Sequence, residues 1–175
     1  GNYGKSKTEK QLENWDKKKR DKKDFDKLIK NEDYIAWKEA FVQQLKDERM
    51  LFFTDPDPKY DRNAITDEYE LELYSRKNEF LWGVLLHVIQ LPTARGILDT
   101  FKKDNPGEEA DARAAFLAID TRMQKGLLRI HSTSTLLIEL IAFTINGFTG
   151  TRTSFLTTWY AKLRDLQMTV NPGQG

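Results

Sequence analysis

The side chains that could carry out chemistry are few in this chain, and they lie far apart. His87 and His131 are the only histidines, and neither has a partner at the spacing of a zinc-binding HExxH pair. The chain has no cysteine, which excludes disulfides, thiol catalysis and cysteine-based zinc sites within these residues. Glycine-rich phosphate loops and GxSxG nucleophile motifs are also absent. We therefore predict no enzymatic activity, no cofactor, no metal and no small-molecule substrate. His87 is predicted to lie in the core and His131 at a helix entry.

Acidic residues are plentiful but fall in predicted loops and first helical turns, where solvation and the helix dipole account for them. The run from Asp55 to Asp61 lacks the glycine and terminal glutamate of a calcium-binding loop. A helical enzyme with an unrecognised site is the least favoured reading of the chain.

A basic segment opens the chain and offers the best candidate for contacts with phosphate. Between Lys5 and Lys30 there are eleven Lys and Arg against six Asp and Glu, a net charge of +5 in a protein whose total is +1. Trp15 and Phe25 flank its densest part and could stack on bases. Interleaved aspartates dilute the signal, so a solvated, partly disordered arm is the simpler alternative. The candidate nucleic-acid-binding residues are Lys17, Lys18, Lys19, Arg20, Lys22 and Lys23.

Residues 66–91 predict the helix around which the other elements must pack. Tyr69, Leu73 and Phe80 begin an apolar stripe at helical spacing, and from Phe80 onward the segment is apolar almost all round. Such a helix has to be surrounded by other elements. Thr66 is a candidate N-cap and Pro92 a stop signal. The apolar run is too short and too interrupted for a membrane span, so we expect no membrane partner.

Further apolar stripes predict helices on both sides of this central helix, and no region gives a clear strand signal. The side chains predicted to face inward are Phe25, Leu28 and Ile29, then Tyr34, Trp37, Phe41 and Leu45, and later Ala112, Ala115, Phe116, Ile119 and Met123. We predict an all-α fold: a compact bundle of six to seven helices around the long central helix 66–91. Residues 1–23 form a basic flexible arm, 24–168 the helical domain, and 169–175 a linker or the end of a fragment. The other predicted helices cover residues 22–29 and 33–48, a short stretch that follows residues 91–96 and ends at Lys103, and residues 108–125 (ended by Gly126), 136–145 (capped within 132–135) and 151–167.

Several blocks, in this order, resemble the Gag polyprotein of copia-type LTR retrotransposons over nearly all of residues 14–170. The opening FDKLIKNEDYIAW (25–37) resembles the family's first tryptophan-bearing helix, and FTDPDP (53–58) falls where similar elements have an Asp-Pro loop. KNEFLWGVL (77–85) resembles the central aromatic helix, and DARAAFLAI (111–119) a later helix with Phe116 in place of the usual tryptophan. The segment 147–166 resembles the Gly-polar turn and the last aromatic helix.

The resemblance implies a retroelement capsid-like domain that self-associates into cytoplasmic virus-like particles packaging the element's RNA. Its partners would be further copies of itself and RNA. The zinc knuckle of many Gag proteins is missing here, and we expect it, with a C-terminal capsid lobe, beyond Gly175. A helical nucleic-acid-binding module acting through the arm is the alternative. The candidate self-association residues are Leu51, Phe52, Phe53, Phe148, Phe155 and Trp159.

Overall fold

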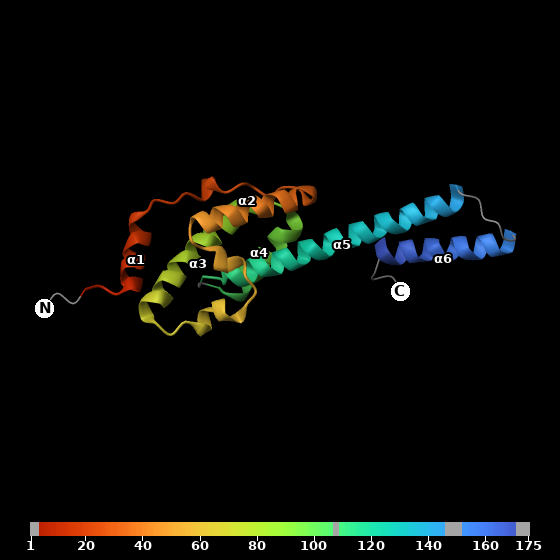
Figure 1. The fold of residues 1–175 in the computed structure, drawn as a ribbon. Coiled ribbons are helices and arrows are strands. Elements are labelled where there is room, and N and C mark those ends of the chain that lie inside the picture. Colours follow the sequence, from red (N-terminus) through yellow and green to blue (C-terminus); the bar gives the residue numbers. More distant parts are fainter. Residues whose placement is uncertain (1–3, 107–108, 146–151, 171–175) are drawn as a thin grey trace. The chain divides into compact units, whose positions relative to one another are not determined.

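The computed structural model describes residues 4–106, 109–145 and 152–170, and within them it is all-α, as predicted (Figure 1). The described residues contain no strand, and a single isolated bridge joins Leu28 and Ile89. The six α-helices are α1 (Lys7–Lys17), α2 (Tyr34–Asp47), α3 (Glu68–Val88), α4 (Pro92–Asp104), α5 (Ala112–Ile145) and α6 (Arg152–Val170).

The chain divides into two compact units, both of which include part of the predicted helical domain 24–168. Unit 1 comprises Gly1–Met123 and unit 2 comprises Gln124–Gly175, so the boundary falls inside α5. The predicted turn at 146–150 lies outside the described residues, as do residues 171–175 of the predicted linker.

Helix α3 is the predicted central helix, and its ends differ slightly from expectation. The Asp67 carboxylate, rather than the Thr66 hydroxyl, caps the helix by accepting a hydrogen bond from the Glu70 amide at 2.8 Å. Pro92 does not stop α3, which ends at Val88, but begins α4 as its first residue. The side chains that α3 buries are Leu73, Tyr74, Asn78, Leu81, Val84, Leu85 and Val88.

The core of unit 1 forms where two predicted stripes meet. On α2 every residue of the predicted stripe is buried, and on α5 all five predicted inward residues are buried as well. Phe41 of α2 stacks on Trp37 at 4.7 Å and on Phe116 of α5 at 5.4 Å between ring centroids. Burying an aromatic side chain of this size contributes about 1.5–3 kcal/mol. The buried stripes are Tyr34, Trp37, Phe41 and Leu45 on α2, and Ala112, Ala115, Phe116, Ile119 and Met123 on α5.

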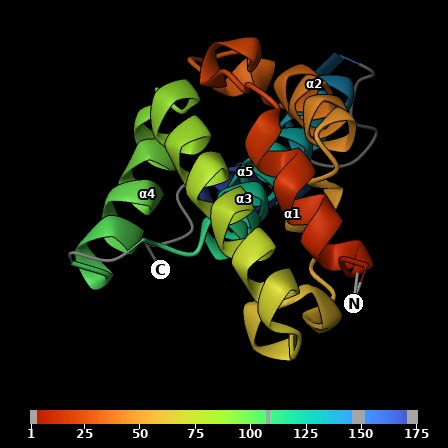
Figure 2. The ribbon, with the colours of Figure 1, turned by 90° about the vertical axis from the view of Figure 1, so that its left-hand side faces the viewer.

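The amino-terminal segment contains a helix packed on the core, where the sequence predicted a flexible arm. Ser6 caps α1 by accepting a hydrogen bond from the Glu9 amide at 3.1 Å. Figure 2 shows α1 beside α3, and Trp15 meets Phe80 of α3 edge-on at 6.1 Å between ring centroids. A single large aromatic side chain thus anchors an otherwise polar helix.

Residues 22–29 form one short 3-10 turn, Lys22–Asp24, rather than a helix. Phe25 and Leu28 are buried as predicted, but Ile29 is 55% exposed. The Leu28 amide donates to the Val88 carbonyl at 2.8 Å, and the Leu28 carbonyl accepts from the Gln90 amide at 2.9 Å. This bridge fixes the turn between α3 and α4 and satisfies backbone groups that an irregular segment would otherwise leave unpaired.

Helix α5 continues through both signals that predicted a break in it. Gly126 lies inside the helix, because an interior glycine costs only about 1 kcal/mol relative to alanine and the flanking residues favour a helix. The residues 132–135 do not cap a new helix; the Thr135 hydroxyl instead donates back to the His131 carbonyl at 3.0 Å. His131 therefore lies exposed in mid-helix and not at a helix entry.

Unit 2 consists of the second half of α5 and of α6, which runs antiparallel to it (Figure 1). Among the residues of unit 2 whose side chains are described, Leu140 alone is buried. Phe155 and Trp159 are half-buried and stack at 6.3 Å between ring centroids. The described side chains of unit 2 thus enclose very little apolar surface.

Candidate functional site

Two members of the predicted basic run serve the fold of unit 1. Lys18 and Arg20 both bind the Glu48 carboxylate, each at 2.9 Å. The Arg20 guanidinium also lies 3.3 Å from the centre of the Trp15 ring and donates to the Trp15 carbonyl at 2.6 Å. Arg20 is therefore a packing residue, and we withdraw it as a free phosphate contact. The side chains of Lys17, Lys19, Lys22 and Lys23 are exposed.

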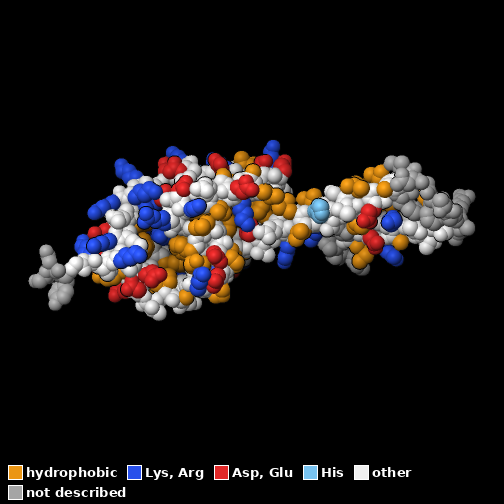
Figure 3. All heavy atoms as spheres, viewed as in Figure 1, with side chains coloured by type: hydrophobic (Ala, Val, Ile, Leu, Met, Phe, Trp, Pro, Cys, Tyr) orange, Lys and Arg blue, Asp and Glu red, His pale blue; other side chains and the backbone are white. Residues whose placement is uncertain are grey.

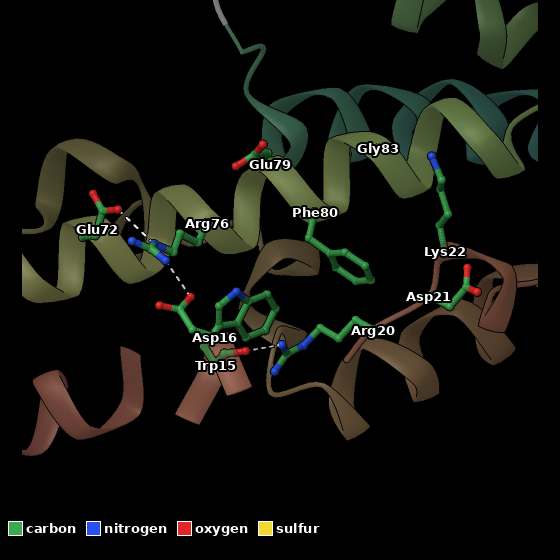
Figure 4. A pocket seen from close by; sticks show the side chains of 10 residues that line it. All are labelled: Trp15, Asp16, Arg20, Asp21, Lys22, Glu72, Arg76, Glu79, Phe80 and Gly83. Atoms are coloured by element: carbon green, nitrogen blue, oxygen red, sulfur yellow. Dashed lines mark hydrogen bonds and ion pairs between the residues drawn. The ribbon is translucent and has the colours of Figure 1, made fainter. Parts of the chain in front are cut away.

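A cleft of about 710 Å³ separates this segment from α3 (Figure 4). Arg76 spans it, binding Asp16 at 2.6 Å and Glu72 at 2.9 Å. The lining contains three cations and four acids, so its charges are nearly balanced. This cleft has little electrostatic attraction to offer an anionic ligand.

Nothing in the sequence indicated a role for Lys77. In the structure, Lys77 lines two further hollows that share part of their walls. They measure about 390 and 630 Å³ and share Gln11, Phe52, Leu73 and Lys77 in their walls. We call the two together the Lys77 groove. Lys77 sits within the KNEFLWGVL block, and nothing in that pattern indicated that its ammonium lies among other cations.

The loop that follows α2 exposes fewer of its apolar side chains than the prediction of a self-association surface at Leu51, Phe52 and Phe53 requires. In the short 3-10 helix Leu51–Thr54, Leu51 is 42% exposed and Phe52 is half-buried, but Phe53 is fully buried and packs at a tilt against Tyr74, 5.2 Å between ring centroids. Phe53 is therefore core and cannot contact a partner, although its ring centre lies 4.4 Å from that of Phe52.

A buried arginine holds the Asp-Pro part of the loop. Arg113 of α5 donates to the backbone carbonyls of Asp55 at 2.7 Å and Asp57 at 2.9 Å, and it forms an ion pair with Asp61. The residue types 55–61 indicated a turn, but the backbone carbonyls that Arg113 binds carry no sequence signature. The loop is thus tied to the core by one side chain.

The predicted self-association residues of unit 2 fall into two groups. Phe155 and Trp159 are half-buried, and Phe148 lies outside the described residues. Other apolar side chains on the two helices of unit 2 are more accessible, and Figure 3 shows hydrophobic side chains at the surface there. We call them together the unit 2 apolar surface, although their helical spacing places them on more than one face of the two helices. They are Leu128, Ile130, Leu137, Ile138 and Ile141 on α5, and Leu156, Tyr160 and Met168 on α6, each 40–67% exposed.

No protein-family model, curated protein or solved structure matches this chain. None of the described helices combines the length and the apolar character that crossing a membrane requires. Within the same residues no group of three or more potential metal ligands comes together, and His87 is half-buried on α3.

Proposed function

We propose that this chain is a structural Gag/capsid-like protein that self-associates into cytoplasmic particles, as its resemblance to copia-type elements implies. The observation that carries the proposal is the unit 2 apolar surface. Among the side chains of unit 2 that the structure describes, eight large apolar ones are at least 40% exposed and one is buried.

A helical pair with so little core is not expected to be stable alone. Units of about 60 residues bury only about 60% of the surface of their unfolded chain and are marginally stable, so staples or association add to their stability. Disulfides are excluded by the lack of cysteine. A second copy of the chain offers the same apolar side chains, so a symmetric contact would cover those that share a face, such as Ile130, Leu137 and Ile141 of α5, in both copies at once.

Particle formation would then rest on many modest interfaces. Each contact buries limited apolar area, and the lattice supplies stability through multivalency. Reversible assembly of this kind needs no catalytic residue.

The test is light scattering and negative-stain microscopy on the full chain over a range of protein concentrations. We expect the wild-type chain to form oligomers or particles, and the double variant Ile138→Glu and Ile141→Glu to remain monomeric with its helicity intact. Ile35→Glu is the matched control, because Ile35 is 57% exposed on α2 in unit 1. A wild-type chain that stays monomeric throughout, or equal loss in the control, contradicts the proposal.

A second candidate function is RNA binding through the amino-terminal segment, which the exposed Lys17, Lys19, Lys22 and Lys23 favour. Replacing these four lysines by glutamine should then abolish RNA binding and flatten its dependence on salt.

A further inference from the structure

The Lys77 groove is built by three parts of unit 1 that are distant in sequence. Helix α1 contributes Trp15, the end of α2 contributes Arg49, and Phe52 follows in the short 3-10 helix. Lys77 comes from α3 and lies where the two hollows meet. Because the two hollows share part of their walls and measure about 390 and 630 Å³, the groove has room for a ligand larger than a single small ion.

Lys77 places a positive charge in the groove without a carboxylate to balance it. Its ammonium donates to the Arg49 carbonyl at 3.1 Å and lies 5.5 Å from the ring centres of both Trp15 and Phe52. Lys77 forms no ion pair within the part of the chain that the structure describes. Burial, and then the neighbouring Arg20 and Arg49, lower the pKa of Lys77, and an anion would relieve both effects.

Arg49 adds a second cation at a backbone position that usually belongs to glycine. Its φ is 55°, in the left-handed region, where it ends α2 while the Met50 amide donates to the Leu45 carbonyl at 2.7 Å. A residue with a Cβ costs roughly 1 kcal/mol there. Its exposed guanidinium has no ion-pair partner among the described residues. Strain of this kind tends to occur where a side chain has a function.

Both charged and aromatic side chains line the groove. Its two hollows together present six cations against three acids, and one of these acids, Glu48, already binds Lys18 and Arg20. Phe52 and Tyr60 add aromatic rings. Figure 3 shows Lys and Arg side chains gathered on this part of unit 1, over α1 and α3. The six cations are Lys7, Lys18, Arg20, Arg49, Lys59 and Lys77.

We propose that the Lys77 groove binds single-stranded nucleic acid, with a phosphate against Lys77 and Arg49 and a base against Phe52. Cations that track a backbone and aromatic rings that stack on bases are the combination such ligands need. A duplex would keep its bases away from Phe52. This inference goes beyond the proposed self-association, which resides in unit 2, and the two fail independently.

The experiment is fluorescence anisotropy of a labelled single-stranded oligouridylate of about 20 nucleotides, titrated with the full chain over a salt series. Lys77→Met and Arg49→Gly should each weaken binding about fivefold and reduce the slope of log K against log salt by about 0.7, the loss of one phosphate contact. Phe52→Leu keeps the apolar packing and should weaken binding about tenfold, the loss of one stacked base.

Two controls separate this groove from a general attraction to positive charge. Lys46→Met removes an exposed lysine of α2, and Lys102→Met removes an exposed lysine of α4. Both lie outside the groove and outside the basic run, so each should change affinity less than about twofold. Circular dichroism shows whether each variant is folded. If Lys77→Met does not fold, Arg49→Gly tests the proposal in its place.

Three results would overturn the proposal. The first is a wild-type chain that fails to bind the oligonucleotide even at low salt. The second is a Lys46→Met or Lys102→Met variant whose binding weakens as much as that of Lys77→Met. The third is displacement of the oligonucleotide by uridine triphosphate at equal phosphate concentration, which would make the groove a mononucleotide site. Light scattering on Lys77→Met should still match the wild-type chain, since unit 2 is unchanged.

Discussion

Tyr34 and Tyr74 of unit 1 both bury a hydroxyl group, but only the Tyr34 hydroxyl has a hydrogen-bond partner among the described residues. Tyr34 of α2 donates to the Asp120 carboxylate at 2.5 Å, and Lys38 binds that carboxylate at 2.8 Å. The Tyr74 hydroxyl is equally enclosed but has no hydrogen-bond partner within the described residues. Burial raises the pKa of Tyr34, with Asp120 adding to the effect, and burial raises the pKa of Tyr74 to about 12.

Replacing each tyrosine by phenylalanine should therefore have different effects on stability. Tyr34→Phe should lower the free energy of unfolding by about 1–2 kcal/mol, because Asp120 loses a buried donor. Tyr74→Phe should leave stability unchanged or raise it by up to about 1 kcal/mol, because no bond is lost and a polar group leaves the core. Urea unfolding at neutral pH measures both, and equal losses would show that the Tyr74 hydroxyl has a partner.

The raised pKa of Tyr74 also predicts the direction of a pH effect. Between pH 10, its ordinary value, and about 12, the folded state holds a proton that the unfolded state has released, so stability falls as the pH rises through this range. Compared with the wild-type chain, Tyr74→Phe should lose less stability over that interval. Urea unfolding at a series of alkaline pH values checks this, and parallel curves would contradict it.

A polar side chain buried in α3 fixes the start of α5. The Asn78 amide donates to the Ala110 carbonyl at 3.0 Å, and its oxygen accepts from the Ala112 amide at 2.9 Å. Two backbone groups at the beginning of the helix are thus satisfied by one residue of another element. Asp111 completes the cap by accepting from the Ala114 amide at 2.9 Å.

Asn78→Ala should lower the free energy of unfolding by roughly 2–3 kcal/mol, since it leaves two buried backbone groups unpaired. Asn105→Ala is the control, because its side chain bonds only the Phe101 carbonyl within its own helix end. Thermal unfolding compares the two variants. A loss at Asn78 no larger than at Asn105 would mean that water replaces the missing amide.

Helix α5 shows how far local signals specify an element. Its first half was predictable, because a stripe from Ala112 to Met123 buries every residue that the pattern assigned to the core. Its continuation was not, because glycine and hydroxyl side chains weaken a helix only slightly and the outcome depends on the whole segment. The packing of α1 on the core was not predicted either, because it depends on a contact between Trp15 and Phe80, which are far apart in the sequence.

Gly126→Ala should stabilise α5 by about 0.5–1 kcal/mol, because alanine reduces the freedom of the unfolded chain. A Cβ at this position meets no atom within 4 Å, so no packing is disturbed. Gly96→Ala in α4 offers a comparison with equal space. A loss of helicity in Gly126→Ala by circular dichroism would contradict a continuous helix here.

At the scale of the whole molecule, the two units differ in how much they bury. Unit 1 holds nearly all of the buried apolar side chains, and unit 2 holds Leu140 alone among its described side chains. The candidate sites follow the same division. The sequence indicated the basic run and the aromatic face of α6. It did not indicate the Lys77 groove, because the residues of the groove come from separate elements, including α1 and α3, and a local sequence pattern carries no information on which distant residues come together.

Backbone amides of α6 should therefore exchange hydrogen faster than those of α3, because opening unit 2 exposes little apolar surface. The exchange in α6 should slow as protein concentration rises, since self-association would cover the unit 2 apolar surface. Hydrogen-exchange mass spectrometry at two concentrations measures both. Rates in α6 that do not depend on concentration would argue against unit 2 as the contact surface.

The boundary inside α5 has a consequence for how unit 2 forms. Starting a helix is the unfavourable step, because several residues must be fixed before the first hydrogen bond repays them, whereas extending an existing helix is not. The half of α5 in unit 1 is fixed by buried side chains such as Phe116 and Ile119. The half in unit 2 can then grow by propagation from a nucleus that it does not have to supply.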